Sequence, residues 1–144
     1  MKDTAPQLTH EQNQPDIFAH LGKTHGLLAE RGLDPALSTL IELRASQINQ
    51  CAYCVAMHLA HARKVGVSQQ KLDTVIVWRE ADCFSAAERA ALAWTETLTY
   101  LDRGVDLEPL RADLRAVFTD AEIAAITADI GMINLWNRVQ RSKH

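Results

Sequence analysis

Helix-start signals recur along this chain, and they restrict it to a helical fold. Ser85-Ala-Ala-Glu88 and Thr119-Asp-Ala-Glu122 both fit the capping box, in which a hydroxyl and a carboxylate satisfy free amides in the first helical turn. Asp34-Pro35 is a third signal, with Asp as N-cap and Pro at the first helical position. Between these signals, apolar residues keep the three- and four-residue spacing of helices, and no stretch shows sustained strand alternation. The sequence therefore predicts an all-α protein.

About seven helices are predicted, joined by loops of ordinary length. They cover about Pro15–Gly32, Asp34–Ile48, Cys51–Lys64, a short helix after Ser68, Ser85–Leu101, a short helix with Leu110 and Leu114, and Asp120–Gln140. In the first helix Ile17, Phe18, Leu21 and Leu28 are expected to face inward, and Asn49 is expected to cap the helix that starts near Cys51. Residues 1–15 are polar and Gln-rich, so we expect a polar N-terminal segment followed by one domain over residues 16–144. A chain of 144 residues suits a single core.

Composition removes several classes of function. A net charge of −3 gives no electrostatic reason to expect binding to nucleic acid or to an anionic membrane. The chain has no apolar run of the length of a transmembrane helix, and its start lacks the apolar stretch of a signal peptide. We therefore expect a cytoplasmic protein, and in that compartment a Cys-x-x-Cys pair is more often catalytic than structural.

The segment Cys51-Ala-Tyr-Cys54-Val-Ala-Met-His58 carries the most chemical information. Its two thiols are three residues apart and the imidazole follows four residues later, so all three side chains project from one face of a helix. Two thiols one turn apart can close a short disulfide, and an imidazole one turn on can take or give a proton. This spacing favours a thiol redox enzyme.

The residues alone leave several alternatives open. The dipole at the helix start favours a thiolate at Cys51, whereas His58 is closer to Cys54, so position does not decide the nucleophile. The two cysteines could instead be inert core residues. Zinc is a further alternative, with His61 as a fourth ligand, but four ligands along one straight helix cannot surround an ion. Haem c attachment is excluded because Val55, not His, follows the second cysteine.

The chain resembles the alkylhydroperoxidase D-like proteins of the carboxymuconolactone decarboxylase family. The resemblance centres on residues 41–66, IELRASQINQCAYCVAMHLAHARKVG, and continues through Trp78–Ala81 and Phe84–Trp94. It ends on Ile133–Arg138, INLWNR, and thus covers about Asp16 to Val139.

This resemblance implies an all-helical fold assembled as a trimer or hexamer. It also implies a peroxidase in which Cys54 attacks a hydroperoxide, Cys51 resolves the sulfenic acid as a disulfide, and His58 moves the proton. No flavin, nicotinamide or haem motif is present, so no cofactor or metal is expected. The electrons would then come from an external dithiol donor.

One position departs from the family pattern. The family's relay usually includes a Glu twelve residues before the first cysteine, and this chain has Thr39 there. Glu42 lies three residues further along, on the same helix face. Either Glu42 substitutes in the relay or it is a solvated surface charge, and in the second case peroxidase activity would be weak.

Three further questions stay open at this level. The function could instead be that of a decarboxylase-like lyase acting on a small acid, or of a non-enzymatic, redox-responsive helical oligomer. The polar residues Asn134, Trp136, Asn137 and Arg138 could border the thiol pocket, although bonding to helix ends or to a neighbouring subunit is the favoured interpretation. Cys83, the third cysteine, has no assigned role.

Overall fold

The computed structural model describes residues 5–143, and these form an all-α fold of eight α-helices and one 3₁₀ turn. The elements are α1 His10–Asn13, α2 Pro15–Glu30, α3 Pro35–Ile48, α4 Ala52–Lys64, α5 Gln69–Thr74, η1 Val75–Val77, α6 Ala86–Tyr100, α7 Glu108–Val117 and α8 Asp120–Arg141. The expected all-α class is confirmed. The eighth helix is the single turn α1, which lies inside the segment expected to be a polar lead.

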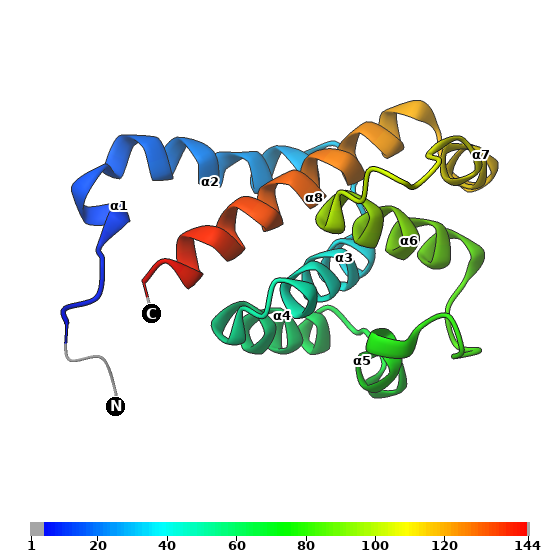
Figure 1. The fold of residues 1–144 in the computed structure, drawn as a ribbon, viewed down its shortest axis with the longest axis horizontal. Helices are drawn as coiled ribbons and strands as arrows, with labels where there is room; N and C mark the ends of the chain where they lie inside the picture. Colours follow the sequence, from blue (N-terminus) through cyan, green and yellow to red (C-terminus); the bar gives the residue numbers. More distant parts are fainter. Residues whose placement is uncertain (1–4, 144) are drawn as a thin grey trace.

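Helix α3 occupies the centre of the molecule and packs against α4, α6 and α8. Helix α8 runs diagonally across the fold, and α2 lies alongside it (Figure 1). Two apolar clusters fill the spaces between these helices. One contains Leu40, Leu43, Ala62, Leu72, Val75, Trp78, Phe84 and Leu92, and the other contains Leu37, Ile41, Ala91, Trp94, Leu114, Ile126 and Ile130. Helix α3 contributes to both clusters, so its sequence fixes the positions of α4 and α8 relative to each other.

The helix starts follow the sequence signals with one exception. Both capping boxes form, at Ser85 with Glu88 and at Thr119 with Glu122. At α4, however, the N-cap is Cys51, whose Sγ accepts the Cys54 amide at 3.3 Å. The expectation that Asn49 caps this helix is wrong, because Asn49 instead ends α3 as its C-cap.

The expected inward face of α2 is partly confirmed, since Phe18, Leu21 and Leu28 are half-buried and Ile17 is not. The helix has no buried residue, and Ile17, expected to face inward, is 54% exposed. Helix α2 packs against α1 and α8. Phe18 does turn toward α8, where its ring lies 6.2 Å from that of Trp136.

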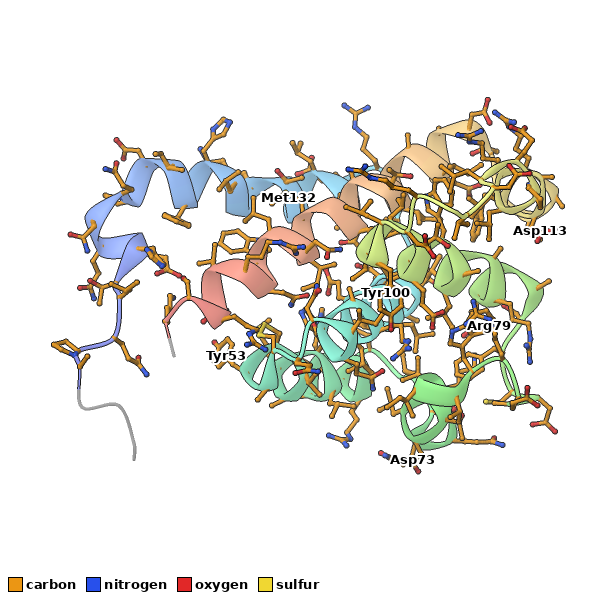
Figure 2. The ribbon with its side chains drawn as sticks, in the orientation of Figure 1. Tyr53, Asp73, Arg79, Tyr100, Asp113 and Met132 are labelled. Carbon is orange, nitrogen blue, oxygen red and sulfur yellow. A yellow bond between two sulfur atoms is a disulfide. The ribbon has the colours of Figure 1, made fainter. Side chains whose placement is uncertain are left out.

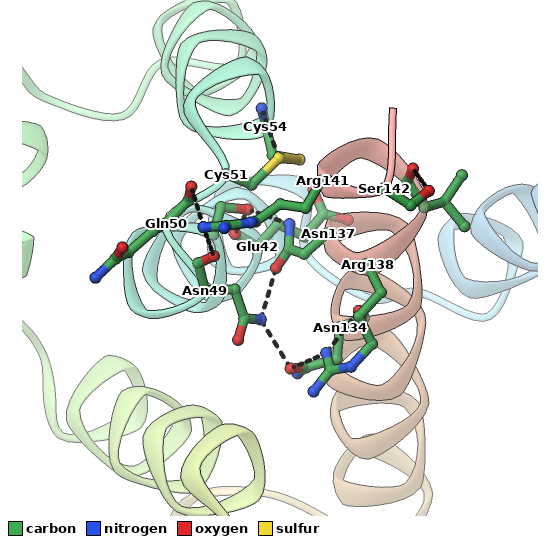
Figure 3. Close-up of a disulfide and its surroundings, with 12 residues drawn as sticks. Glu42, Asn49, Gln50, Cys51, Cys54, Asn134, Asn137, Arg138, Arg141 and Ser142 are labelled. Atoms are coloured by element: carbon green, nitrogen blue, oxygen red, sulfur yellow. Dashed lines mark hydrogen bonds between the residues drawn. A yellow bond between two sulfur atoms is a disulfide. The ribbon is translucent and has the colours of Figure 1, made fainter. Parts of the chain in front are cut away.

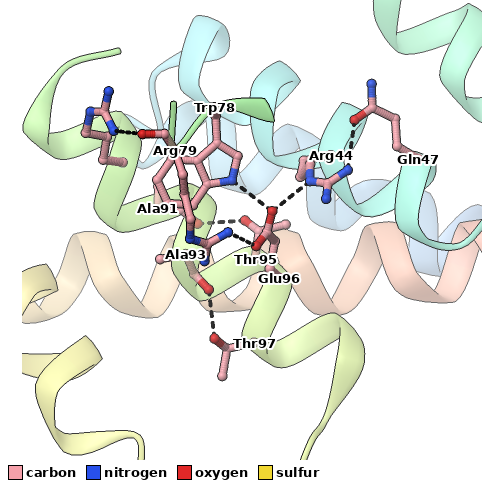
Figure 4. Close-up of polar contacts among 10 residues, drawn as sticks. Arg44, Gln47, Trp78, Arg79, Ala91, Ala93, Thr95, Glu96 and Thr97 are labelled. Carbon is pink, nitrogen blue, oxygen red and sulfur yellow. Dashed lines mark hydrogen bonds and ion pairs between the residues drawn. The ribbon is translucent and has the colours of Figure 1, made fainter. Parts of the chain in front are cut away.

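The buried carboxylate of Glu96 connects several elements in the middle of the fold (Figure 4). Glu96 on α6 accepts hydrogen bonds from Arg44 Nε at 2.8 Å, Trp78 Nε1 at 2.8 Å and Arg79 Nη1 at 2.5 Å. Burial raises the pKa of Glu96, but these donors outweigh burial and lower the pKa overall. The carboxylate thus links α3, the segment after η1 and α6.

None of the helices within residues 5–143 has the length and apolar character needed to cross a membrane.

Candidate active site

The two sequence-predicted cysteines meet at the start of α4. Cys51 and Cys54 are joined by a disulfide, with their Cα atoms 5.2 Å apart. Both are buried, with 3% and 1% of their surfaces exposed. The side chain of Tyr53, between them, points outward at the edge of the molecule (Figure 2).

The turn that leads into Cys51 is held by α8 (Figure 3). Asn49 Nδ2 donates to the side-chain oxygens of Asn134 and Asn137, both at 2.9 Å. Arg141 donates to the carbonyl oxygens of Asn49 and Gln50. Gln50 has a φ of 54°, so this turn depends on support from outside. The two asparagines therefore bond a helix end, which agrees with the favoured interpretation of the C-terminal polar residues.

His58 lies one turn beyond Cys54, is only 6% exposed and faces Glu42 from α3. Its Nδ1 lies 3.0 Å from Glu42 Oε2, which is an ion-pair distance. Neither ring nitrogen makes a hydrogen bond of good geometry within the described residues, so a small rotation is needed to align the pair.

This contact excludes one of the two alternatives that Thr39 raised for Glu42. Glu42 is 6% exposed and reaches the imidazole from its displaced position, so its interpretation as a solvated surface charge is wrong. Thr39 is fully buried and its hydroxyl donates to the Ala36 carbonyl in its own helix.

Three further polar residues lie near Glu42 and were not predicted from the sequence: His25, Ser38 and Asp129. His25 Nδ1 on α2 lies 3.7 Å from Glu42 Oε1. Asp129 on α8 is fully buried and accepts a hydrogen bond from Ser38 Oγ at 2.8 Å. One signal was present in the sequence for Asp129: a carboxylate that falls on the apolar face that Ile126 and Ile130 define.

Glu42 and Asp129, the carboxyl pair, have opposite pKa directions. Burial raises the pKa of Glu42, but the neighbouring His58, Asp129 and His25 side chains outweigh burial and lower it. Burial and the neighbouring charge of Glu42 raise the pKa of Asp129 to about 8, against a weaker opposing effect of the Ser38 hydroxyl. Two adjacent buried carboxyls cannot both ionise, so one keeps its proton.

His25, Glu42 and Asp129 also bring three ligand-type atoms within 4.8 Å of one another, as a metal site would. The bonding of His25 disfavours a metal, however. Trp136 Nε1 donates to His25 Nε2 at 2.8 Å, and an indole nitrogen can only donate. His25 therefore accepts at Nε2 and carries its own proton on Nδ1, which leaves no lone pair directed at Glu42.

Two hollows border His58. The thiol hollow, about 270 Å³, is lined by His25, Tyr53, Cys54, Met57, His58, Ile133, Trp136 and Gln140. The acid hollow, about 290 Å³, is lined by His25, Leu28, Ala29, Leu33, Pro35, Ser38, Glu42, Met57, His58, His61 and Asp129. Trp136 thus borders the thiol hollow, unlike its asparagine neighbours. A larger hollow of about 520 Å³ between α2 and α8 contains no thiol or imidazole, so we do not assign chemistry to it.

The free energy of unfolding is expected to fall as pH rises from about 5 to 8. Asp129 has a native pKa of about 8 against an ordinary value of 3.8, so in this window the folded protein holds a proton that the unfolded chain has released. Each pH unit in this window lowers the free energy of unfolding by up to about 1.4 kcal/mol. Stability from the lowered pKa of Glu42 is lost only when pH falls below its ordinary value of 4.5, outside this window. Denaturant unfolding at several pH values measures the slope, and Asp129→Asn should flatten it; equal slopes in both proteins would contradict the assignment.

Comparison with known proteins places the chain in a family. The model of the carboxymuconolactone decarboxylase family matches residues 15–97, more than half of the chain. An uncharacterised protein of Bacillus subtilis (strain 168), YdfG, is 34% identical over 100 residues, which cover 69% of this chain and 68% of that protein. The chain therefore belongs to the carboxymuconolactone decarboxylase family.

Solved structures agree with this assignment. A protein of unknown function from Agrobacterium tumefaciens, named as a candidate antioxidant defence protein AhpD, is 35% identical, with a TM-score of 0.89 over 96% of this chain and 95% of that one. A peroxidase-related protein with an alkylhydroperoxidase AhpD core, from Ralstonia eutropha JMP134, is 28% identical, with a TM-score of 0.78 over 91% of this chain and 70% of that one. The fold is therefore AhpD-like, as the sequence predicted.

Proposed function

We propose that this protein is a thiol-dependent reductase of organic hydroperoxides, in which Cys54 is the attacking thiol. One observation carries the proposal: Cys54 and His58 line the same hollow, and Glu42, which does not line it, contacts His58 Nδ1. The peroxidase-related relatives support the same class of reaction.

The choice between the two thiols follows from their surroundings. The Cys51 sulfur accepts a hydrogen bond from the Cys54 amide at the start of α4, where the helix dipole favours a thiolate. The hollow beside Cys51 is lined by Gln50, Ala52, Tyr53, Gln140 and Arg141 and has no imidazole. Cys54 is 1% exposed and shares the thiol hollow with His58, which can take its proton during attack. We assign the attack to Cys54 because a base is available only there.

In the proposed first step, His58 takes the Cys54 proton and the sulfur attacks the terminal peroxide oxygen. The O–O bond breaks as the S–O bond forms, so sulfur is oxidised to a sulfenic acid and the alkoxide leaves with the proton from His58. Glu42 holds the imidazole and balances its charge between these transfers. The thiol hollow, with Ile133, Met57 and Trp136 in its wall, suits the apolar part of an organic hydroperoxide.

Cys51 completes the cycle as the resolving thiol. Its sulfur attacks the Cys54 sulfenic acid, the S–O bond breaks and water leaves, which gives the disulfide that the structure contains. An external dithiol donor then reduces this disulfide in two exchange steps and is itself oxidised to a disulfide. No other cofactor takes part in the proposed cycle.

We also propose that the protein works as a homo-oligomer. Helix α2 has no buried residue and exposes Ile17 and Leu27, each at 54%. Apolar side chains left open along one helix are typical of a surface that a second copy covers.

We expect cumene hydroperoxide to consume two thiols per chain in the fully reduced protein. The chain has three cysteines, so a thiol titration under denaturing conditions should fall from three to one. The remaining thiol should be Cys83, which is free and contacts Thr74 in the structure. Cys83→Ser is the matched control and should still lose two thiols. An unchanged thiol count after peroxide treatment would contradict the proposed cycle.

A lyase acting on a small acid remains the second candidate. The matched family model is named for a lactone decarboxylase, and proton transfer by His58 and Glu42 needs no thiol. A non-enzymatic redox-responsive oligomer would react with peroxide once and then stop, whereas the proposed enzyme turns over in excess dithiol.

A further inference from the structure

Asp129 lies in the middle of α8 with one carboxyl oxygen bonded and the other unpartnered. Ser38 Oγ donates to its Oδ2 at 2.8 Å, and Oδ1 has no hydrogen-bond partner within the described residues. The side chain is fully buried, and it lies with His25 and Glu42 in a group whose ligand-type atoms are all within 4.8 Å. A buried carboxyl oxygen without a partner is costly unless it carries a proton and donates it.

The distribution of charge around the carboxyl pair locates this proton. Glu42 has two imidazoles against it, His58 at 3.0 Å and His25 at 3.7 Å. The hydrogen bond that Asp129 makes among residues 5–143 comes from the neutral hydroxyl of Ser38. Because only one member of a buried carboxyl pair ionises, the anion belongs on Glu42 and the proton on Asp129. The raised pKa of Asp129 and the lowered pKa of Glu42 agree with this distribution.

We propose that Asp129 is a positioning residue that stays protonated and donates a hydrogen bond to Glu42, which holds that carboxylate against His58. The link to catalysis rests on the proposed function, since only that reaction uses His58 as the base for Cys54. Glu42 is then fixed from two sides, with its negative charge directed at the His58 Nδ1 proton. His58 Nε2 is left as the nitrogen that exchanges a proton with the thiol.

Substitution distinguishes a protonated Asp129 from an ionised one. In Asp129→Asn, the amide N–H₂ can donate to Glu42 and the amide oxygen can accept from Ser38, so asparagine reproduces the bonding of a neutral aspartic acid. Asp129→Leu fills similar volume but offers no donor. We expect Asp129→Leu to slow alkylation of Cys54 by iodoacetamide in the reduced protein between about tenfold and a hundredfold, as misplaced catalytic groups do. Asp129→Asn should restore most of that rate.

The pH profile adds a readout that a merely structural role would not change. The titratable groups that line the acid hollow around Asp129 are His25 from α2, Glu42 from α3, and His58 and His61 from α4. As Asp129 loses its proton near pH 8, Glu42 loses its donor and gains a repelling charge. The wild-type alkylation rate, corrected for the ordinary rise of thiolate with pH, should therefore fall through this range, and the Asp129→Asn profile should not. A Leu variant that keeps the wild-type rate, or an Asn variant as slow as Leu, would overturn the proposal.

A direct measurement separates this inference from the proposed function. Carboxyl ¹³C NMR of the disulfide-bonded protein needs no hydroperoxide, and the Asp129 signal is the one that Asp129→Asn removes. We expect that signal to keep the chemical shift of a protonated acid at pH values well above those at which an ordinary aspartate titrates. Titration in the ordinary range would overturn the inference even if the protein reduces hydroperoxides. A high titration in a protein that does not reduce hydroperoxides would support it and refute the proposed function alone.

Discussion

Replacing Cys54 with serine is expected to abolish turnover of organic hydroperoxides. A serine hydroxyl is not ionised near neutral pH and cannot form the sulfenic acid, so both the attack and the later disulfide are lost. The loss in kcat/KM should be at least about a thousandfold, as is found when an enzyme loses its nucleophile. Cumene hydroperoxide consumption, coupled to an excess of a small dithiol, measures the rate.

Cys51→Ser is the matched variant, because it keeps the thiol beside His58 and removes its partner. It should react once with peroxide and stop at a Cys54 sulfenic acid, which dimedone labels and mass spectrometry locates. A dimedone label on Cys51 in the Cys54→Ser protein, with peroxide still consumed, would reverse the assignment of the two thiols. The same pair of variants tests the lyase alternative, since proton transfer on a small acid would continue in both.

The local part of the site could be predicted from the sequence because helical spacing alone determines it. Cys54 and His58 are four residues apart within α4, and Cys51, three residues before Cys54, is the N-cap of that helix, so local spacing places all three at the start of one helix. The capping boxes at Ser85 and Thr119 were predictable for the same reason, since each cap is complete within four residues.

The surroundings of Glu42 could not be predicted, because they depend on how distant helices pack. Ser38 and Asp129 are 91 residues apart, and His25 and Trp136 are 111 apart. No spacing rule links such pairs, although a carboxylate on an apolar helix face indicates that Asp129 needs a buried partner. Asn49 was misassigned as the N-cap of α4, because the side-chain partners that hold it, Asn134 and Asn137, also come from the far end of the chain.

Glu42→Gln is expected to lower the rate of hydroperoxide reduction by about a hundredfold, the usual contribution of general acid–base catalysis. The carboxylate faces His58 Nδ1 at 3.0 Å and supplies the charge that balances a protonated imidazole. A glutamine side chain has nearly the same shape but no charge, so proton transfer from Cys54 to His58 becomes less favourable. The fraction of Cys54 present as thiolate at neutral pH should fall with it, and iodoacetamide alkylation of the reduced protein at a series of pH values measures that fraction.

Thr39→Val is the control on the same helix, at the position where the family usually has its glutamate. Among residues 5–143 the Thr39 hydroxyl donates to the Ala36 carbonyl of its own helix and to no other group, so its removal should leave the alkylation profile unchanged. Equal slowing in both variants would mean that damage to α3, rather than loss of the Glu42 charge, causes the effect. A Glu42→Gln protein with wild-type rate and profile would mean that His58 works without a carboxylate partner. Slowing in Glu42→Gln alone would instead show that a carboxylate displaced by one helical turn replaces the family's usual glutamate, because the central position of α3 still directs it at His58.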